Sequence, residues 1–160
     1  MRILLLTIGE FSHVNNKLLE QFVANGCEYI RIDLLEYIER KEIFRHPYII
    51  GLGLFLAFLK DPKSFKTSYK KSAFAFNCLS KIATQLVEEV ECDIIVQTQV
   101  FFTIDRKQVN KPYFIYTDFT HHLFNIDIES SVASMNLVPV EEAALNLEQA
   151  AYQSADKVFV

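Results

Sequence analysis

The sequence predicts an α/β fold, a doubly wound and mainly parallel β-sheet with helices on both faces. Three observations support this prediction. Short runs rich in aliphatic residues alternate with longer segments whose apolar residues recur at helical spacing. The aliphatic runs are nearly continuous, which is typical of strands buried on both faces. The first two runs and the segment between them span only about 30 residues, the size of a βαβ unit with parallel strands.

The amino-terminal half begins with that unit. Residues 2–8 form an aliphatic run that ends at a glycine, and residues 28–33 (EYIRID) form a second strand that ends in a carboxylate. Between them, residues 15–25 place four apolar side chains at helical spacing before Gly26, which favours a helix stop. Residues 48–59 predict another helix, which the proline three residues later would end.

The second half continues the alternation. Residues 72–90 place apolar side chains at steps of three and four, which predicts a long amphipathic helix. Residues 93–97 and 112–117 predict two further buried strands. A proline and two glutamates between residues 139 and 142 predict the first turn of a last helix, and residues 157–160 begin another strand.

Composition limits the classes of protein to which the chain can belong. Its 160 residues are 51% hydrophobic, enough for one domain with a sizeable core. A net charge of −4 gives no electrostatic basis for binding nucleic acid. Cys27, Cys78 and Cys92 are far apart and odd in number, which argues against a disulfide framework or a zinc site and favours a reducing compartment. The longest apolar run falls short of the roughly 20 residues of a membrane-spanning helix, so we expect a cytoplasmic protein.

In a doubly wound sheet, ligands bind beyond the carboxyl ends of the strands. Four strand exits are therefore the candidate site. They comprise residues 9–16, 33–35, 98–102 and 118–122.

The first exit has one glycine and two titratable side chains. Gly9 leads towards a helix N-terminus, where backbone N–H groups suit an anion. A dinucleotide-binding loop needs three glycines, however, and Glu10 would repel a phosphate. Two interpretations stay open: a turn capped by Ser12 or Asn15, and a ligand loop in which His13 reaches the site.

The fourth exit combines a carboxylate with two imidazoles. Asp118 is followed closely by His121 and His122. A carboxylate–histidine pair suits acid/base chemistry or contact with a sugar hydroxyl. The alternative is that Asp118 only caps a turn while His121 is exposed. Two adjacent histidines on a loop point in different directions, so we predict no metal site here.

A basic cluster stands out in this acidic chain. An apolar helix followed by lysines and aromatic residues is typical of a contact with anionic lipid. The alternative is a solvated loop beside a core helix. The cluster contains Lys60, Lys63, Lys66, Lys70 and Lys71.

Three segments together resemble one enzyme family. The opening MRILLLT precedes a glycine turn, and residues 112–120 read PYFIYTDFT. The most specific match is Glu148, Tyr152 and Ala155-Asp156, followed by the apolar residues 158–160. In these segments the chain resembles the amino-terminal domain of a GT-B-fold, family 4-like retaining glycosyltransferase. The resemblance is poor between residues 36 and 80.

The resemblance implies a two-domain enzyme with a cleft between Rossmann-like halves. Residues 1–160 would be the single acceptor-side domain, a fragment truncated before a carboxyl-terminal domain that holds the nucleotide-sugar donor. No cofactor is implied in this half, and the fragment alone would be inactive. Expected acceptors are a sugar, a glycolipid or another glycan. Peripheral association with the inner membrane face would agree with the lysine cluster.

The resemblance also assigns residues by position. Gly9, Glu10 and His13 match a loop near the donor phosphates, and Asp118 with His121 matches residues near the transferred sugar, the expected catalytic positions. The chain departs from the family where the usual glycine pair is reduced to Gly9 followed by Glu10. The alternative function is a non-catalytic α/β module that binds a ligand or regulates a partner.

Overall fold

The computed structural model describes residues 1–9, 14–38, 72–117 and 140–160. These residues form a five-stranded, all-parallel sheet in the order β2-β1-β3-β4-β5. The α/β, Rossmann-like fold expected from the sequence is thereby confirmed. The strands are β1 (Arg2–Thr7), β2 (Glu28–Asp33), β3 (Ile94–Thr98), β4 (Tyr113–Tyr116) and β5 (Lys157–Phe159).

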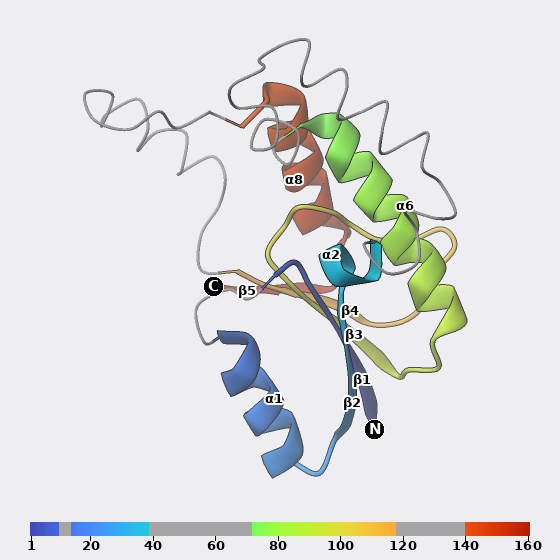
Figure 1. Ribbon diagram of the computed structural model, residues 1–160, viewed down its shortest axis with the longest axis vertical. Coiled ribbons are helices and arrows are strands. Elements are labelled where there is room, and N and C mark those ends of the chain that lie inside the picture. Colours follow the sequence, from blue (N-terminus) through green and yellow to red (C-terminus); the bar gives the residue numbers. More distant parts are fainter. Residues whose placement is uncertain (10–13, 39–71, 118–139) are drawn as a thin grey trace, which may run out of the picture.

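Helices cover both faces of the sheet, as predicted. Helix α1 lies on one face, and α6 and α8 lie side by side on the other (Figure 1). The short helix α2 follows β2 and contacts α6. The predicted helix at residues 48–59 lies outside the described ranges. The described helices are α1 (Val14–Ala24), α2 (Leu34–Tyr37), α6 (Ala73–Glu89) and α8 (Glu142–Ser154).

Local chemistry sets the helix ends. Gly26 adopts a φ of +69°, a left-handed conformation that follows the end of α1 and that glycine accepts without strain. Ser72 caps α6 by accepting a hydrogen bond from the N–H of Ala75 at 3.2 Å. Helix α8 begins at Glu142, one of the two glutamates predicted for its first turn, whereas Pro139 lies outside the described residues.

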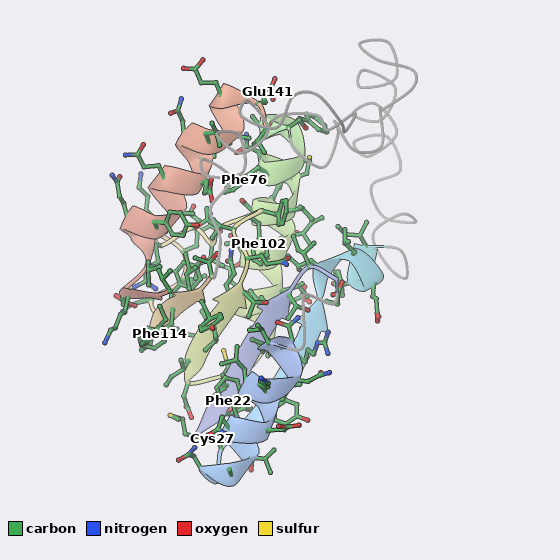
Figure 2. The ribbon with its side chains drawn as sticks, turned by 90° about the vertical axis from the view of Figure 1, so that its left-hand side faces the viewer. Phe22, Cys27, Phe76, Phe102, Phe114 and Glu141 are labelled. Carbon is green, nitrogen blue, oxygen red and sulfur yellow. The ribbon has the colours of Figure 1, made fainter. Side chains whose placement is uncertain are left out.

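The core is concentrated on the α6–α8 face. Leu4, Leu6 and Ile95 from the sheet pack there against the two helices. Figure 2 labels two aromatic members of this core, Phe76 of α6 and Phe102. The burial of so many apolar side chains on one face is the main stabilising contribution to the fold.

The opposite face is covered more lightly. None of the apolar residues of α1 is fully buried, and Val23 is 61% exposed. The one buried residue of α1 is polar, Asn15. Helical spacing therefore predicted the helix correctly but overstated how much apolar surface it buries.

The connection from β3 to β4 contains no helix. Residues 99–112 return to the start of β4 as a loop, which we call the crossover. Its buried side chains, Val100, Phe102, Ile104 and Val109, belong to the core beneath α6 and α8. The crossover therefore fills the layer that a helix usually occupies in a parallel connection.

Candidate functional site

Strands β1 and β3 are neighbours whose connections diverge. They pair in register from Ile3 with Ile94 to Leu6 with Gln97. The chain leaving β1 turns back through α1 to β2, whereas the chain leaving β3 proceeds to β4 on the other side. Such a switch point is where doubly wound sheets bind ligands, because the diverging connections leave space between them. Here we use "switch point" for residues 7–9 and 14–16 together with residues 98–99.

Gly9 and Asn15 define the β1 side of the switch point. Gly9 has a φ of +66°, and a Cβ built on it would meet no atom within 4 Å, so the space beside it is open. The side-chain Nδ2 of Asn15 donates to the Gly9 carbonyl at 3.4 Å. Asn15 is 3% exposed, and its Oδ1 accepts no hydrogen bond from any residue that the structure describes. The helix N-terminus therefore carries a buried acceptor without a partner.

Thr98 provides a second unpartnered polar atom, on the β3 side. The residue is 2% exposed, and its Oγ1 has no hydrogen-bond partner among the described residues. Ile95 and Gln97 face the α6–α8 core, so strand alternation directs Thr98 to the α1 face. An unsatisfied buried polar group costs about 1–3 kcal/mol. Two such groups at one switch point are the strongest indication of a ligand site in the described residues.

A buried network holds the exit of β3 in its unusual shape. Gln99 adopts a φ of +65°, a conformation that is uncommon outside glycine. Just before it, the amide of Gln97 donates to the carbonyls of Gln99 and Phe102, both at 2.8 Å. Gln97 Oε1 in turn accepts from the hydroxyl of Tyr113 at 2.6 Å. Burial raises the pKa of Tyr113, so this hydroxyl remains a donor at neutral pH.

The exit of β2 lies next to that of β1. Asp33 Oδ1 accepts from the N–H groups of Leu35 and Glu36 and so caps α2, a helix that the sequence did not predict. Asp33 Oδ2 accepts from the hydroxyl of Thr7 at 3.1 Å. Asp33, the first residue of the predicted strand exit 33–35, thus has a structural role and also places a carboxylate beside the switch point.

The exit of β4 is backed by a buried acidic residue on α8. Glu148 is 4% exposed and accepts from the hydroxyl of Tyr152 at 3.0 Å. Burial is the main cause of a raised Tyr152 pKa and the Glu148 carboxylate adds to it, while a hydrogen bond with Thr117 opposes it. Thr117 is the residue before Asp118, so this chain of contacts ends at the strand exit that the sequence predicted.

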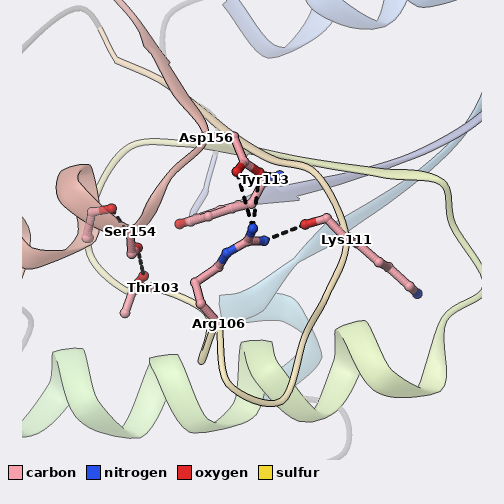
Figure 3. Close-up of polar contacts among 7 residues, drawn as sticks. Thr103, Arg106, Lys111, Tyr113, Ser154 and Asp156 are labelled. Atoms are coloured by element: carbon pink, nitrogen blue, oxygen red, sulfur yellow. Dashed lines mark hydrogen bonds and ion pairs between the residues drawn. The ribbon is translucent and has the colours of Figure 1, made fainter.

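A separate groove of about 650 Å³ lies between α6, α8 and the crossover. Two of its hydroxyls, those of Thr103 and Ser154, are 3.2 Å apart (Figure 3). The hydroxyl of Thr84 donates to the Ser80 carbonyl and accepts from the N–H of Asp105. These lining groups are engaged within the protein, which makes the groove a poorer candidate than the switch point.

Arg106, which lines this groove, forms an ion pair with Asp156. The guanidinium of Arg106 donates to both carboxylate oxygens of Asp156, at 3.2 and 3.3 Å, and to the Lys111 carbonyl (Figure 3). Asp156 also accepts from the N–H of Tyr113 at 2.8 Å. Asp156 therefore links Arg106 of the crossover to Tyr113 at the start of β4.

The structure brings one of the predicted site residues, Gly9, to the switch point. Of the two residues expected to cap the turn after β1, Ser12 lies outside the described ranges. Asn15 lies inside α1, which begins at Val14, and the Asn15 side-chain amide donates back to the Gly9 carbonyl. Sequence reasoning missed the unpartnered side-chain atoms of Asn15 and Thr98. The available signal was their position, since each is a polar residue at an end of a largely apolar element.

The remaining predicted site residues lie outside the described ranges. They are Glu10, His13, Asp118 and His121, and Lys60, Lys63, Lys66, Lys70 and Lys71 of the basic cluster. In the described ranges, no cluster of three His, Cys, Asp or Glu side chains could hold a metal ion, and no helix there is long and apolar enough to cross a membrane.

Comparisons with family models, with curated proteins and with solved structures return no match to this chain.

Proposed function

We propose that this chain is the acceptor-side domain of a retaining, hexosyltransferase-type glycosyltransferase. It would shape the pocket for a sugar, glycolipid or other glycan, while a nucleotide-sugar domain beyond this chain supplies the donor. The proposal combines the sequence resemblance with the Rossmann-like sheet and its switch point.

One observation carries the proposal. The switch point holds two buried polar atoms, Asn15 Oδ1 and Thr98 Oγ1, that no group in the described part of the chain satisfies. Sugar acceptors are recognised through hydroxyl groups, which need such fixed donors and acceptors in a concave site. Asp118 follows the next strand exit along the sheet, where an acid/base residue would be useful.

The test is sugar transfer by a protein that carries this chain together with the proposed donor domain. We expect transfer of labelled hexose from a nucleotide-sugar to a glycan acceptor, and a loss of about 100-fold or more in Asp118→Ala with the fold retained. The control is Glu91→Ala, because Glu91 is exposed at the opposite, amino-terminal edge of the sheet. Wild-type turnover in Asp118→Ala would remove Asp118 from the catalytic site.

The 160-residue chain alone should transfer no sugar, because the proposal places the donor site in the other domain. Sugar transfer by this chain alone would refute that assignment of the donor site. Ligand binding at the switch point without transfer in the longer protein would favour the alternative, a non-catalytic binding or regulatory module.

The lysine cluster supports a separate part of the proposal, a peripheral contact with anionic membrane. Co-sedimentation with phosphatidylserine vesicles should be strong at low salt and weak at high salt, because ions screen such contacts. Equal binding at both salt concentrations, or none, would refute the electrostatic contact.

A further inference from the structure

We infer that the switch point binds a neutral hydroxyl-bearing ligand through Asn15 Oδ1 and Thr98 Oγ1, and that it does not bind a phosphate. This inference rests on the proposed function, because it names the part of a glycan acceptor that the domain would hold. It differs from the expectation that the loop after β1 lies near donor phosphates.

The orientation of the Asn15 amide is fixed by its neighbour. A backbone carbonyl only accepts hydrogen bonds, so the side-chain atom that faces the Gly9 carbonyl at 3.4 Å must be the Nδ2 donor. The other atom is therefore Oδ1, a pure acceptor, which is buried without a partner. A ligand atom that satisfies it must carry a proton, as a hydroxyl or an N–H group does.

Thr98 adds the complementary property. Its unpartnered hydroxyl can donate one hydrogen bond and accept others. A ligand hydroxyl can donate to Asn15 and accept from Thr98, so one or two adjacent hydroxyls would satisfy both residues. This pattern matches a sugar or another polyol.

The charges around the switch point disfavour an anion. Residues 7–9, 14–16 and 98–99 contain no lysine or arginine. The Asp33 carboxylate lies beside them, hydrogen-bonded to Thr7 at 3.1 Å. A phosphate oxygen would face both the lone pairs of Asn15 Oδ1 and this carboxylate, and no lysine or arginine among residues 7–9, 14–16 and 98–99 would offset the repulsion.

The inference can be tested by titrating the 160-residue chain with glucose, N-acetylglucosamine and myo-inositol, and separately with inorganic phosphate and pyrophosphate. Amide NMR shifts report on binding, and the side-chain amide of Asn15 reports on its location. We expect at least one polyol to shift Asn15, Thr98 and Gln99, and neither phosphate to do so. If no polyol shifts these residues, or if phosphate does, the inference is wrong.

Two matched threonine substitutions separate recognition from folding. Thr98→Val removes an unpartnered hydroxyl, so it should raise the melting temperature while weakening polyol binding about tenfold. Thr84→Val removes a buried hydroxyl that makes two hydrogen bonds on the opposite face, so it should lower the melting temperature and leave binding unchanged. Unchanged polyol affinity in Thr98→Val would overturn the inference.

These outcomes are distinguishable from failure of the proposed function. Sugar transfer by the longer protein with an unchanged acceptor KM in Thr98→Val would refute the hydroxyl site and keep the glycosyltransferase. Polyol binding that Thr98→Val weakens, together with no transfer from any nucleotide-sugar, would keep the site and refute the enzyme.

Discussion

The α6–α8 groove and the switch point both contain a buried threonine, but they differ in whether its hydroxyl group is hydrogen-bonded. In the groove, the buried hydroxyl of Thr84 makes hydrogen bonds at 2.8 and 2.9 Å. At the switch point, the equally buried hydroxyl of Thr98 makes none. The difference shows that a concavity is not by itself a binding site, because the groove encloses about 650 Å³ while its hydroxyls already stabilise the protein.

The same contrast explains where stability and function are concentrated. Satisfied buried networks hold the crossover, β4 and α8 in one arrangement. Unsatisfied groups lower stability and persist where a ligand supplies the missing partner. The predictions below test this division, starting from the largest expected effect.

Gln97→Leu should cause the largest loss of stability. Gln97 is fully buried, and its replacement leaves the Tyr113 hydroxyl and the carbonyls of Gln99 and Phe102 without partners. We expect the free energy of unfolding in urea to fall by about 3 kcal/mol. Gln85→Leu is the control, because Gln85 is an exposed glutamine lining the groove and should change stability by less than about 0.5 kcal/mol. Similar losses in both variants would contradict the role of the network.

Alkaline pH should weaken the same satisfied region. Burial raises the pKa of Tyr113 above its ordinary value of 10.0, so above that pH the unfolded chain loses a proton that the folded chain retains. Stability should be fully present below pH 10 and fall above it, by about 1.4 kcal/mol per pH unit for each tyrosine that titrates in this way.

The check is urea unfolding at several pH values between 8 and 11. Tyr113→Phe should be less stable than the wild type at pH 8 and show a shallower decline above pH 10. An identical decline in the two proteins would mean that Tyr113 does not contribute to the alkaline loss.

Two glycine substitutions compare the switch point with a remote turn. Gly9 and Gly26 have φ values of +66° and +69°, and a Cβ would be unobstructed at both. Alanine at either position should cost about 1 kcal/mol through backbone strain alone. Gly9→Ala should also weaken polyol binding, measured by NMR titration, whereas Gly26→Ala should not. Equal effects on binding would argue against a site beside Gly9.

The smallest effect is expected at the amino-terminal edge. Arg2 pairs with Glu91 at 3.5 Å, and the Glu91 side chain is 95% exposed. Exposed pairs contribute little, so Glu91→Gln should leave both the melting temperature and ligand binding unchanged. A clear loss of binding would show that the amino-terminal edge belongs to the site.

Sequence alone predicted every strand of the described sheet and three of its four helices. Those elements are encoded locally, by aliphatic runs and by helical spacing of apolar residues, as in residues 72–90 for α6. Helix α2 was missed because it spans a single turn, too short for a periodic pattern. Its N-cap, Asp33, is also the last residue of β2, so its capping role is apparent only in the structure. Two of the predicted strand exits, residues 9–16 and 98–102, contribute residues to the switch point, whereas its unpartnered atoms were not predicted.

The sequence by itself therefore determined the fold class, the strand exits and Gly9 as the turn after β1. Only the tertiary structure decided that β1 and β3 are neighbours. It also decided that the Thr84 hydroxyl has hydrogen-bond partners in the described chain, whereas Asn15 Oδ1 and Thr98 Oγ1 have none there. The physical reason is that periodicity depends on near neighbours in the chain, whereas hydrogen-bond satisfaction depends on partners such as Asp105, which lies 21 residues from Thr84.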